Sequence, residues 1–176
     1  MKKLLSLLVI LFLGPILVLA DGVENYYIHA TIEQNGDLLV EEYFTLSGYY
    51  NGFERKINFK NPSATPFNIN ATSFGGSTVH NGTGIERVKI GSASLSFNGD
   101  FSSLNIETFE EDNNASKGDY GVYEVTTNYK GDDILIYNPS RKKRAFYLKY
   151  RLKNMAILYN DVGEIGWNTV GSEFTE

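Results

Sequence analysis

The 176-residue chain contains no cysteine, and this absence excludes several chemistries at once. Without thiols there can be no disulfide bond, no thiolate metal site, no cysteine nucleophile and no acylated cysteine of a lipoprotein anchor. Histidine is scarce as well: the chain has His29 and His80, and neither has a second histidine at a metal-ligand interval. We therefore predict no metal and no cofactor, and a fold that holds itself together by packing.

Several motifs of common enzymes are also missing. The chain has no Gly-x-Ser-x-Gly sequence, no glycine-rich phosphate loop and no His-Glu-x-x-His sequence. Serine hydrolase, nucleotide-binding and zincin functions therefore have no support.

Long apolar runs are absent except at the N-terminus. Residues 1–20 combine two early lysines, the apolar run 4–13 and a small-residue pattern that ends at Ala20, which is typical of a signal peptide. We predict that the mature protein begins at Asp21, is exported and is soluble once processed. An uncleaved anchor is the alternative, but Gly14-Pro15 interrupts the run, and a membrane span needs about 20 uninterrupted apolar residues.

Positive charge is in the minority. Without Lys2 and Lys3, 14 of the 16 basic side chains remain against 21 acidic ones, so the mature net charge is −7. This argues against nucleic acid and anionic lipid headgroups as general partners. The 156 residues left after residue 20 are enough for one domain that buries about 68 to 70% of its unfolded surface.

What the mature chain does have is apolar alternation with a period of two, which is typical of β-strands. Tyr26–Ile32 and Leu38–Leu46 alternate on either side of the turn residues Asn35-Gly36-Asp37, which predicts a hairpin. The clearest strand is Ala145–Lys153, and we predict Asp133–Tyr137 as its hairpin partner.

Weaker strands are predicted at 67–74, 86–90, 94–97, 104–109 and 121–129, and a polar, mobile loop at 110–119. Eight or nine short strands at this spacing indicate an all-β domain, an antiparallel sandwich of immunoglobulin-like or jelly-roll-like type.

One acidic residue breaks the alternation. Glu42 shares the parity of Val40 and Phe44, so its carboxylate points into the predicted core. A buried carboxylate needs a partner. The nearest cationic candidate in the sequence is Arg55, at the far end of the aromatic turn 49–53, and we predict an ion pair between Glu42 and Arg55.

The alternation stops between Tyr159 and Gly171. Asp161 and Glu164 have capping-box spacing there, which predicts a short helical turn that contains Trp167, although Gly163 and Gly166 weaken it.

The segments around Glu42, Arg55 and Trp167 resemble those of a known protein family. The segments 35–42, 52–57, 150–152 and 159–168 resemble, in order and spacing, the N-terminal region of the predicted membrane proteins grouped as domain of unknown function 2207. The resemblance implies an extracytoplasmic β-rich domain followed by transmembrane helices, so membrane association is expected through helices that this chain does not contain. A fragment and a short secreted form are the two alternatives for a chain that ends at Glu176.

The family has no assigned activity, so its motif carries over as positions of unknown role. These positions are Glu42, Arg55, Asp161, Glu164, Trp167 and Asn168. The enzymatic alternative is a carbohydrate-active enzyme in which Asp161 and Glu164 form an acid/base pair beside Trp167. We favour a structural role, because carboxylates so close in sequence rarely flank a substrate.

Three further groups of residues belong to predicted turns and loops. The acidic residues of segment 110–119 miss the calcium-loop pattern and are interpreted as a solvated loop. An aromatic turn and a basic tip are candidates for a binding surface; they consist of Tyr49, Tyr50, Phe53, Arg141, Lys142, Lys143 and Arg144. The sequence thus predicts an exported domain that binds an envelope component or another protein, or has a structural role there, and is not an enzyme.

Overall fold

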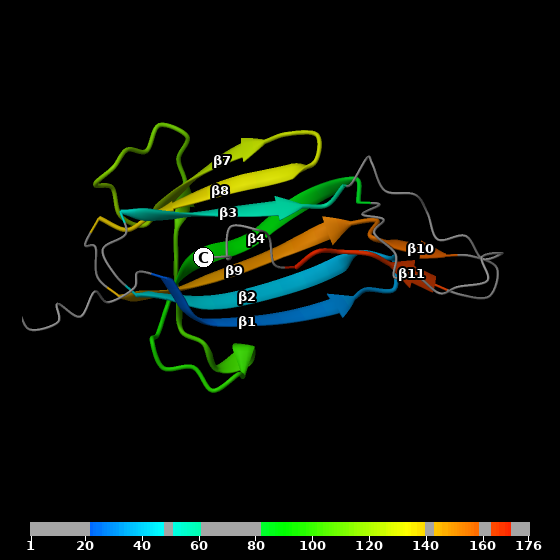
Figure 1. Cartoon of the computed structure of the whole chain (residues 1–176), viewed down its shortest axis with the longest axis horizontal. Helices are drawn as coiled ribbons and strands as arrows, with labels where there is room; N and C mark the ends of the chain where they lie inside the picture. The colour runs from blue at the N-terminus through cyan, green and yellow to red at the C-terminus, as the bar shows by residue number, and fades with distance from the viewer. Residues whose placement is uncertain (1–21, 48–50, 61–81, 140–142, 159–162, 170–176) are drawn as a thin grey trace, which may run out of the picture.

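The structure is a computed structural model, and it describes residues 22–47, 51–60, 82–139, 143–158 and 163–169 (Figure 1). These residues form a sandwich-like all-β fold of two large sheets and one small one. The predicted fold class is confirmed. Across the described residues, no helix has the length and apolar character that a membrane crossing needs.

The larger sheet has five antiparallel strands. In spatial order they are β1 (Gly22–Ile32), β2 (Leu38–Ser47), β9 (Arg144–Lys153), β4 (Gly84–Ala93) and β5 (Ile106–Thr108). The second sheet has four strands, in the order β3 (Gly52–Asn58), β8 (Gly131–Tyr137), β7 (Val122–Thr127) and β6 (Glu110–Glu111). The β6–β7 pair is parallel, and the other neighbours are antiparallel.

The described residues also form three short elements. The strands β10 (Ala156–Leu158) and β11 (Gly163–Ile165) pair antiparallel as a small sheet of their own. The 3-10 turn η1 (Phe101–Ser103) lies between β4 and β5. Its N-cap is Asp100, whose side chain accepts a hydrogen bond from the backbone N–H of Ser102.

The core lies between the two large sheets, because alternate residues of their central strands point inward. Its fully buried members include Val40 and Phe44 from β2, Phe146 and Leu148 from β9, and Ile134 and Ile136 from β8. The interior is therefore supplied by strands that are far apart in the sequence, and it encloses every inward position of β2.

The first predicted hairpin is confirmed. The strands β1 and β2 pair from Gly22 with Ser47 to Ile32 with Leu38. The turn between them requires Gly36, which has a φ of +86° in the left-handed region that favours glycine.

The predicted hairpin between Asp133–Tyr137 and Ala145–Lys153 is wrong. The strand β8 pairs with β3 and β7, whereas β9 pairs with β2 and β4, so the chain crosses from one sheet to the other after Asn138-Pro139. Ile134 and Ile136 are fully buried in the shared core, which requires β8 to face β9 instead of lying beside it.

Two other local predictions are corrected. Segment 94–97 forms no strand. Phe97 leaves the sheet and packs on the ring of Tyr43, on the outer face of the five-stranded sheet, with ring centroids 4.4 Å apart. Segment 110–119 begins with strand β6, because the backbone N–H of Glu110 donates to the carbonyl of Gly121. The predicted strand at 67–74 lies outside the described residues.

The predicted helical turn near Glu164 is also wrong. Gly163–Ile165 is a strand, and its residues pair with Ala156–Leu158. The two glycines that weaken a helix here are compatible with extended backbone, so pairing with β10 decides the local conformation.

Candidate functional site

The motif residues Glu42 and Arg55 meet in the interior, between β2 and β3. Glu42 is 0% exposed and Arg55 is 1% exposed. Arg55 Nε donates to Glu42 Oε2 at 2.9 Å, and Arg55 Nη2 donates to Glu42 Oε1 at 2.8 Å. The predicted ion pair is confirmed, and its two parallel bonds join one sheet to the other.

Two more groups complete this buried cluster. The hydroxyl of Tyr150 donates to Glu42 Oε1, and burial together with the charge of Glu42 raises the pKa of Tyr150 well above its usual value. Arg55 also donates to the carbonyls of Lys56 at 2.6 Å and Thr169 at 2.8 Å. The guanidinium of Arg55 thus lies directly against the carboxylate of Glu42, and further hydrogen bonds engage both groups inside the core.

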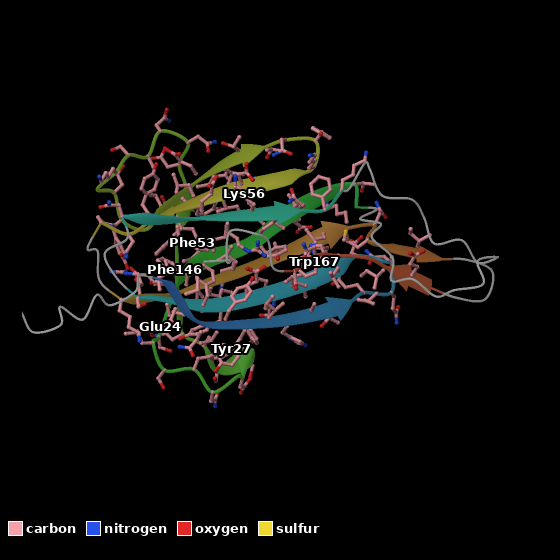
Figure 2. The ribbon with its side chains drawn as sticks, in the orientation of Figure 1. Glu24, Tyr27, Phe53, Lys56, Phe146 and Trp167 are labelled. Carbon is pink, nitrogen blue, oxygen red and sulfur yellow. The ribbon has the colours of Figure 1, made fainter. Side chains whose placement is uncertain are left out.

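The chain after β11 closes over this cluster. Trp167 packs against the hydrophobic core, and its ring meets that of Tyr150 edge-on, with centroids 6.3 Å apart and an interplanar angle of 75° (Figure 2). The bond from Arg55 to the Thr169 carbonyl holds the same segment. The motif residues therefore connect the first half of the domain to its last described segment.

A different site lies on the outer face of the five-stranded sheet, where the segment between β4 and β5 folds back over β1 and β2. A pocket of about 470 Å³ opens there. It is lined by Tyr27, Ile28, His29, Glu41, Gly99, Asp100, Phe101 and Ser102. Figure 2 shows Tyr27 on β1, next to the green segment that follows β4.

The polar hub of this outer pocket is Glu41, the neighbour of Glu42 on β2. Its Oε1 accepts hydrogen bonds from the hydroxyl of Tyr147 at 2.5 Å and from the ammonium of Lys149 at 3.3 Å. Its Oε2 lies 3.7 Å from Nδ1 of His29. Burial and Glu41 together raise the pKa of Tyr147, so Tyr147 stays a neutral donor at physiological pH.

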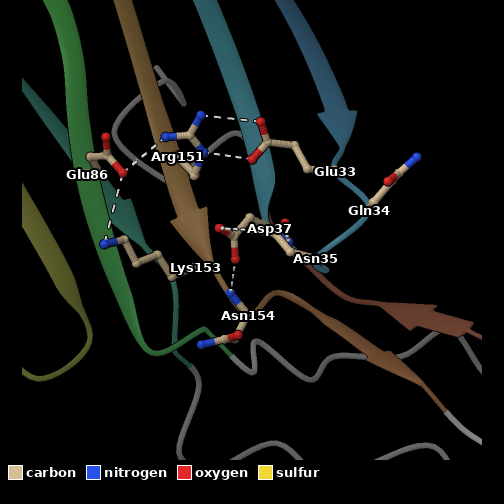
Figure 3. Close-up of a pocket in the computed structure, with 8 residues that line it drawn as sticks. All are labelled: Glu33, Gln34, Asn35, Asp37, Glu86, Arg151, Lys153 and Asn154. Carbon is tan, nitrogen blue, oxygen red and sulfur yellow. Dashed lines mark hydrogen bonds and ion pairs between the residues drawn. The ribbon is translucent and has the colours of Figure 1, made fainter.

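A second, polar hollow lies at the end of the sheet beside the β1–β2 turn (Figure 3). Arg151 donates from Nε to Glu33 at 2.7 Å and from Nη1 to Glu86 at 3.0 Å. Asp37 accepts from the backbone N–H of Asn154 at 2.8 Å. The charged groups of this hollow are thus already bonded within the protein. We therefore interpret them as stabilising the turn and not as binding a ligand.

The comparison with protein families decides where the chain belongs. Residues 22–175 match the model described as the N-terminal domain of a predicted membrane protein, DUF2207. The chain belongs to the DUF2207 family. Neither the curated proteins nor the solved structures gave a match.

In this DUF2207 domain, the remaining motif positions are Asp161, Glu164 and Asn168. Glu164 lies on β11 and is half-buried, and Asn168 is exposed. Asp161 lies outside the described residues, so the alternative of an acid/base pair of Asp161 and Glu164 is untested.

The predicted aromatic and basic surface is only partly described. Phe53 is partly buried and packs against the core, with its ring centroid 4.7 Å from that of Phe44. Lys143 forms an ion pair with Glu24, and the guanidinium of Arg144 lies 4.6 Å from the ring centre of Tyr120. The other positions of this surface, Tyr49, Tyr50, Arg141 and Lys142, lie outside the described residues, as does His80, which is not part of it.

The acidic segment after β6 makes local turns. Asp112 accepts from the backbone N–H of Asn114 at 2.9 Å, and Asp119 accepts from that of Ser116 at 2.8 Å. Within the described ranges, no three acidic or histidine side chains are grouped so that they could hold a metal ion.

Sequence reasoning did not predict the pocket around His29. The pocket needs Phe101 and Asp100, which come from a segment without strand periodicity. The available signal was the pair of aromatic residues Phe97 and Phe101, spaced as on one turn of helix, in an otherwise polar stretch.

Proposed function

We propose that this DUF2207 domain works outside the cytoplasm as a non-catalytic binding module of the cell envelope. Membership in a family of predicted membrane proteins supports an envelope location, and the signal-like residues 1–20 support export.

The observation that carries the proposal is the closed surroundings of Glu42 and Arg55. Both side chains are buried and bonded to each other, so they hold the two sheets together and offer no charge to a substrate. General acid/base chemistry requires groups within reach of a bound molecule. The most distinctive charged residues of the domain therefore support the fold.

Binding requires a different surface, and the outer pocket provides one. Its wall includes Tyr27, which is 40% exposed although its ring contacts Phe97 and Tyr43. Partly exposed aromatic rings in fixed positions are typical of binding sites, because they bury apolar area with little loss of side-chain entropy.

Envelope binding can be tested by sedimentation. The chain, purified as cells produce it, is mixed with washed envelope fragments of the producing organism, and we expect it to sediment with them without releasing reducing sugar ends. Protein-free lipid vesicles serve as the control for nonspecific membrane attachment. A chain that stays in the supernatant would overturn the proposal.

The same experiment distinguishes binding from the enzymatic alternative. Release of reducing ends that Glu164→Gln abolishes, while the variant unfolds at the same temperature as the wild type, would make the domain a carbohydrate-active enzyme. Protease digestion of intact cells tests the location, since an extracytoplasmic domain is degraded without lysis.

A further inference from the structure

We infer that the outer pocket on β1 and β2 is a glycan site that holds one pyranose ring between aromatic rings and carboxylates. This inference rests on the proposed binding function and adds the ligand class and the residues that bind it. The pocket, at about 470 Å³, falls within the range of about 300 to 1,000 Å³ that small-molecule sites have.

The aromatic part of the pocket is built by two rings, Tyr27 from β1 and Phe101 from η1. The ring of Phe97 lies between them: its centroid is 5.0 Å from that of Tyr27 and 5.0 Å from that of Phe101, in both cases near edge-on. This arrangement fixes both rings before any ligand arrives. Such rings offer an apolar surface to the C–H face of a sugar.

The polar part of the pocket is a pair of carboxylates, Asp100 and Glu41. The backbone N–H and the hydroxyl of Ser102 both donate to Asp100 Oδ1, at 3.0 and 2.6 Å. These bonds lower the pKa of Asp100, so this exposed carboxyl stays ionised at neutral pH. An ionised carboxylate can only accept hydrogen bonds, so the ligand must donate them.

The charges of the pocket argue against other ligand classes. Two carboxylates repel phosphate and other anions. A cationic ligand is less favoured, since Lys149 already donates to Glu41 and His29 lies beside the same carboxylate. A neutral ligand that combines an apolar face with several hydroxyl donors fits both parts of the pocket, and a pyranose has this chemistry.

The test uses neutral trimers of glucose, mannose and N-acetylglucosamine as probes, with the full chain and NMR or calorimetric titration. We expect at least one trimer to bind and to shift the signals of Tyr27, His29 and Phe101. Phe101→Ala and Asp100→Asn should each weaken this binding about tenfold, because each removes about 1.4 kcal/mol of contact.

Matched controls separate the pocket from general effects. Tyr129→Ala removes an aromatic ring that is 69% exposed on the turn between β7 and β8. Asp112→Asn changes an aspartate that also accepts from a backbone N–H two residues later, but outside the pocket. Both controls should bind the trimer like the wild type, and Asp100→Asn should unfold at the wild-type temperature.

Three results would overturn the inference. In the first, none of the three trimers binds at about 10 mM. In the second, a trimer still binds after each of the two pocket substitutions. In the third, the NMR signals of the pocket respond to tetramethylammonium but to no sugar. Envelope sedimentation distinguishes this failure from that of the proposed function. If Phe101→Ala still sediments like the wild type, the domain binds the envelope through another surface.

Discussion

Glu41 and Glu42 are neighbours on β2, yet they lie on opposite faces of the sheet and in opposite environments. Each accepts a hydrogen bond from a tyrosine of β9, Tyr147 for Glu41 and Tyr150 for Glu42. Each also has a cation, Lys149 outside and Arg55 inside. The side chain of Glu41 is 17% exposed, whereas that of Glu42 is 0% exposed.

The comparison teaches that burial, and not the identity of the partners, decides what such a cluster does. The inner cluster has lost water, so any unmatched donor or acceptor there carries a large free-energy penalty. The outer cluster keeps contact with water and can exchange partners at small cost. One therefore fixes the fold, and the other is open to a ligand.

The largest expected difference is in the stability lost when each of the two cations is removed. Arg55→Ala leaves the carboxylate of Glu42 buried without its cation, and the free energy of unfolding should fall by about 3 to 5 kcal/mol. Lys149→Ala removes the outer counterpart and should cost less than about 1 kcal/mol. Urea denaturation measures both, and equal losses would contradict the comparison.

The two tyrosines give the next difference. Tyr150→Phe removes a buried donor to Glu42, and we expect a loss of about 1 to 3 kcal/mol. Tyr147 is itself buried, but its partner Glu41 is partly exposed, so we expect water to replace the lost hydroxyl in Tyr147→Phe and the cost to be about 0.5 kcal/mol. Thermal unfolding of the two variants side by side provides the measurement. A larger loss of stability in Tyr147→Phe than in Tyr150→Phe would mean that the outer cluster, and not the inner one, stabilises the fold.

Alkaline pH should act on the inner cluster through Tyr150. Burial and Glu42 raise the pKa of this hydroxyl in the folded state above the usual value of 10.0. Above pH 10 the unfolded chain therefore loses a proton that the folded chain keeps, so stability falls as the pH rises, by about 1.4 kcal/mol per pH unit for this group.

Unfolding curves between pH 8 and pH 11 test this expectation. Below the usual tyrosine pKa both states keep the proton, so the contribution of Tyr150 is constant there. Tyr150→Phe should show a shallower decline above pH 10 than the wild type. An identical slope in the two proteins would mean that Tyr150 titrates normally.

The smallest expected effect concerns salt. Glu41→Gln should change stability by less than about 1 kcal/mol, and the difference from wild type should shrink between low salt and about 1 M salt, because salt screens partly exposed ion pairs more than buried ones. A buried pair is screened much less, so the loss in Arg55→Ala should stay nearly constant over the same range. Parallel denaturation series at the two salt concentrations check both statements.

The sequence was sufficient to predict the buried pair. Alternation places Glu42 among apolar residues of one parity, and a buried carboxylate requires a cation, which left Arg55 as the nearest candidate. This argument needs only a period of two and a rule of charge compensation. It therefore succeeded without any knowledge of the sheet order.

The sheet order itself could not be predicted in the same way. The turn residues Asn138-Pro139 show that the chain changes direction, but a turn within a sheet and a crossing between sheets use the same residues. The position of β8 depends on which partners bury Ile134 and Ile136, and those partners come from the opposite sheet. Pairing with β10, likewise a non-local contact, overrode the capping-box spacing at Glu164.

The bond from Arg55 to the carbonyl of Thr169 spans 114 residues, and the one from Tyr150 to Glu42 spans 108. Contacts of such long range form late, because the intervening chain must be ordered before they can contribute. The cluster at the centre of the domain is thus absent until the last strands have been synthesised. Until Thr169 has been synthesised, a nascent chain lacks the bond that ties the last described segment to Arg55, so any shorter chain holds its two sheets together with fewer buried bonds.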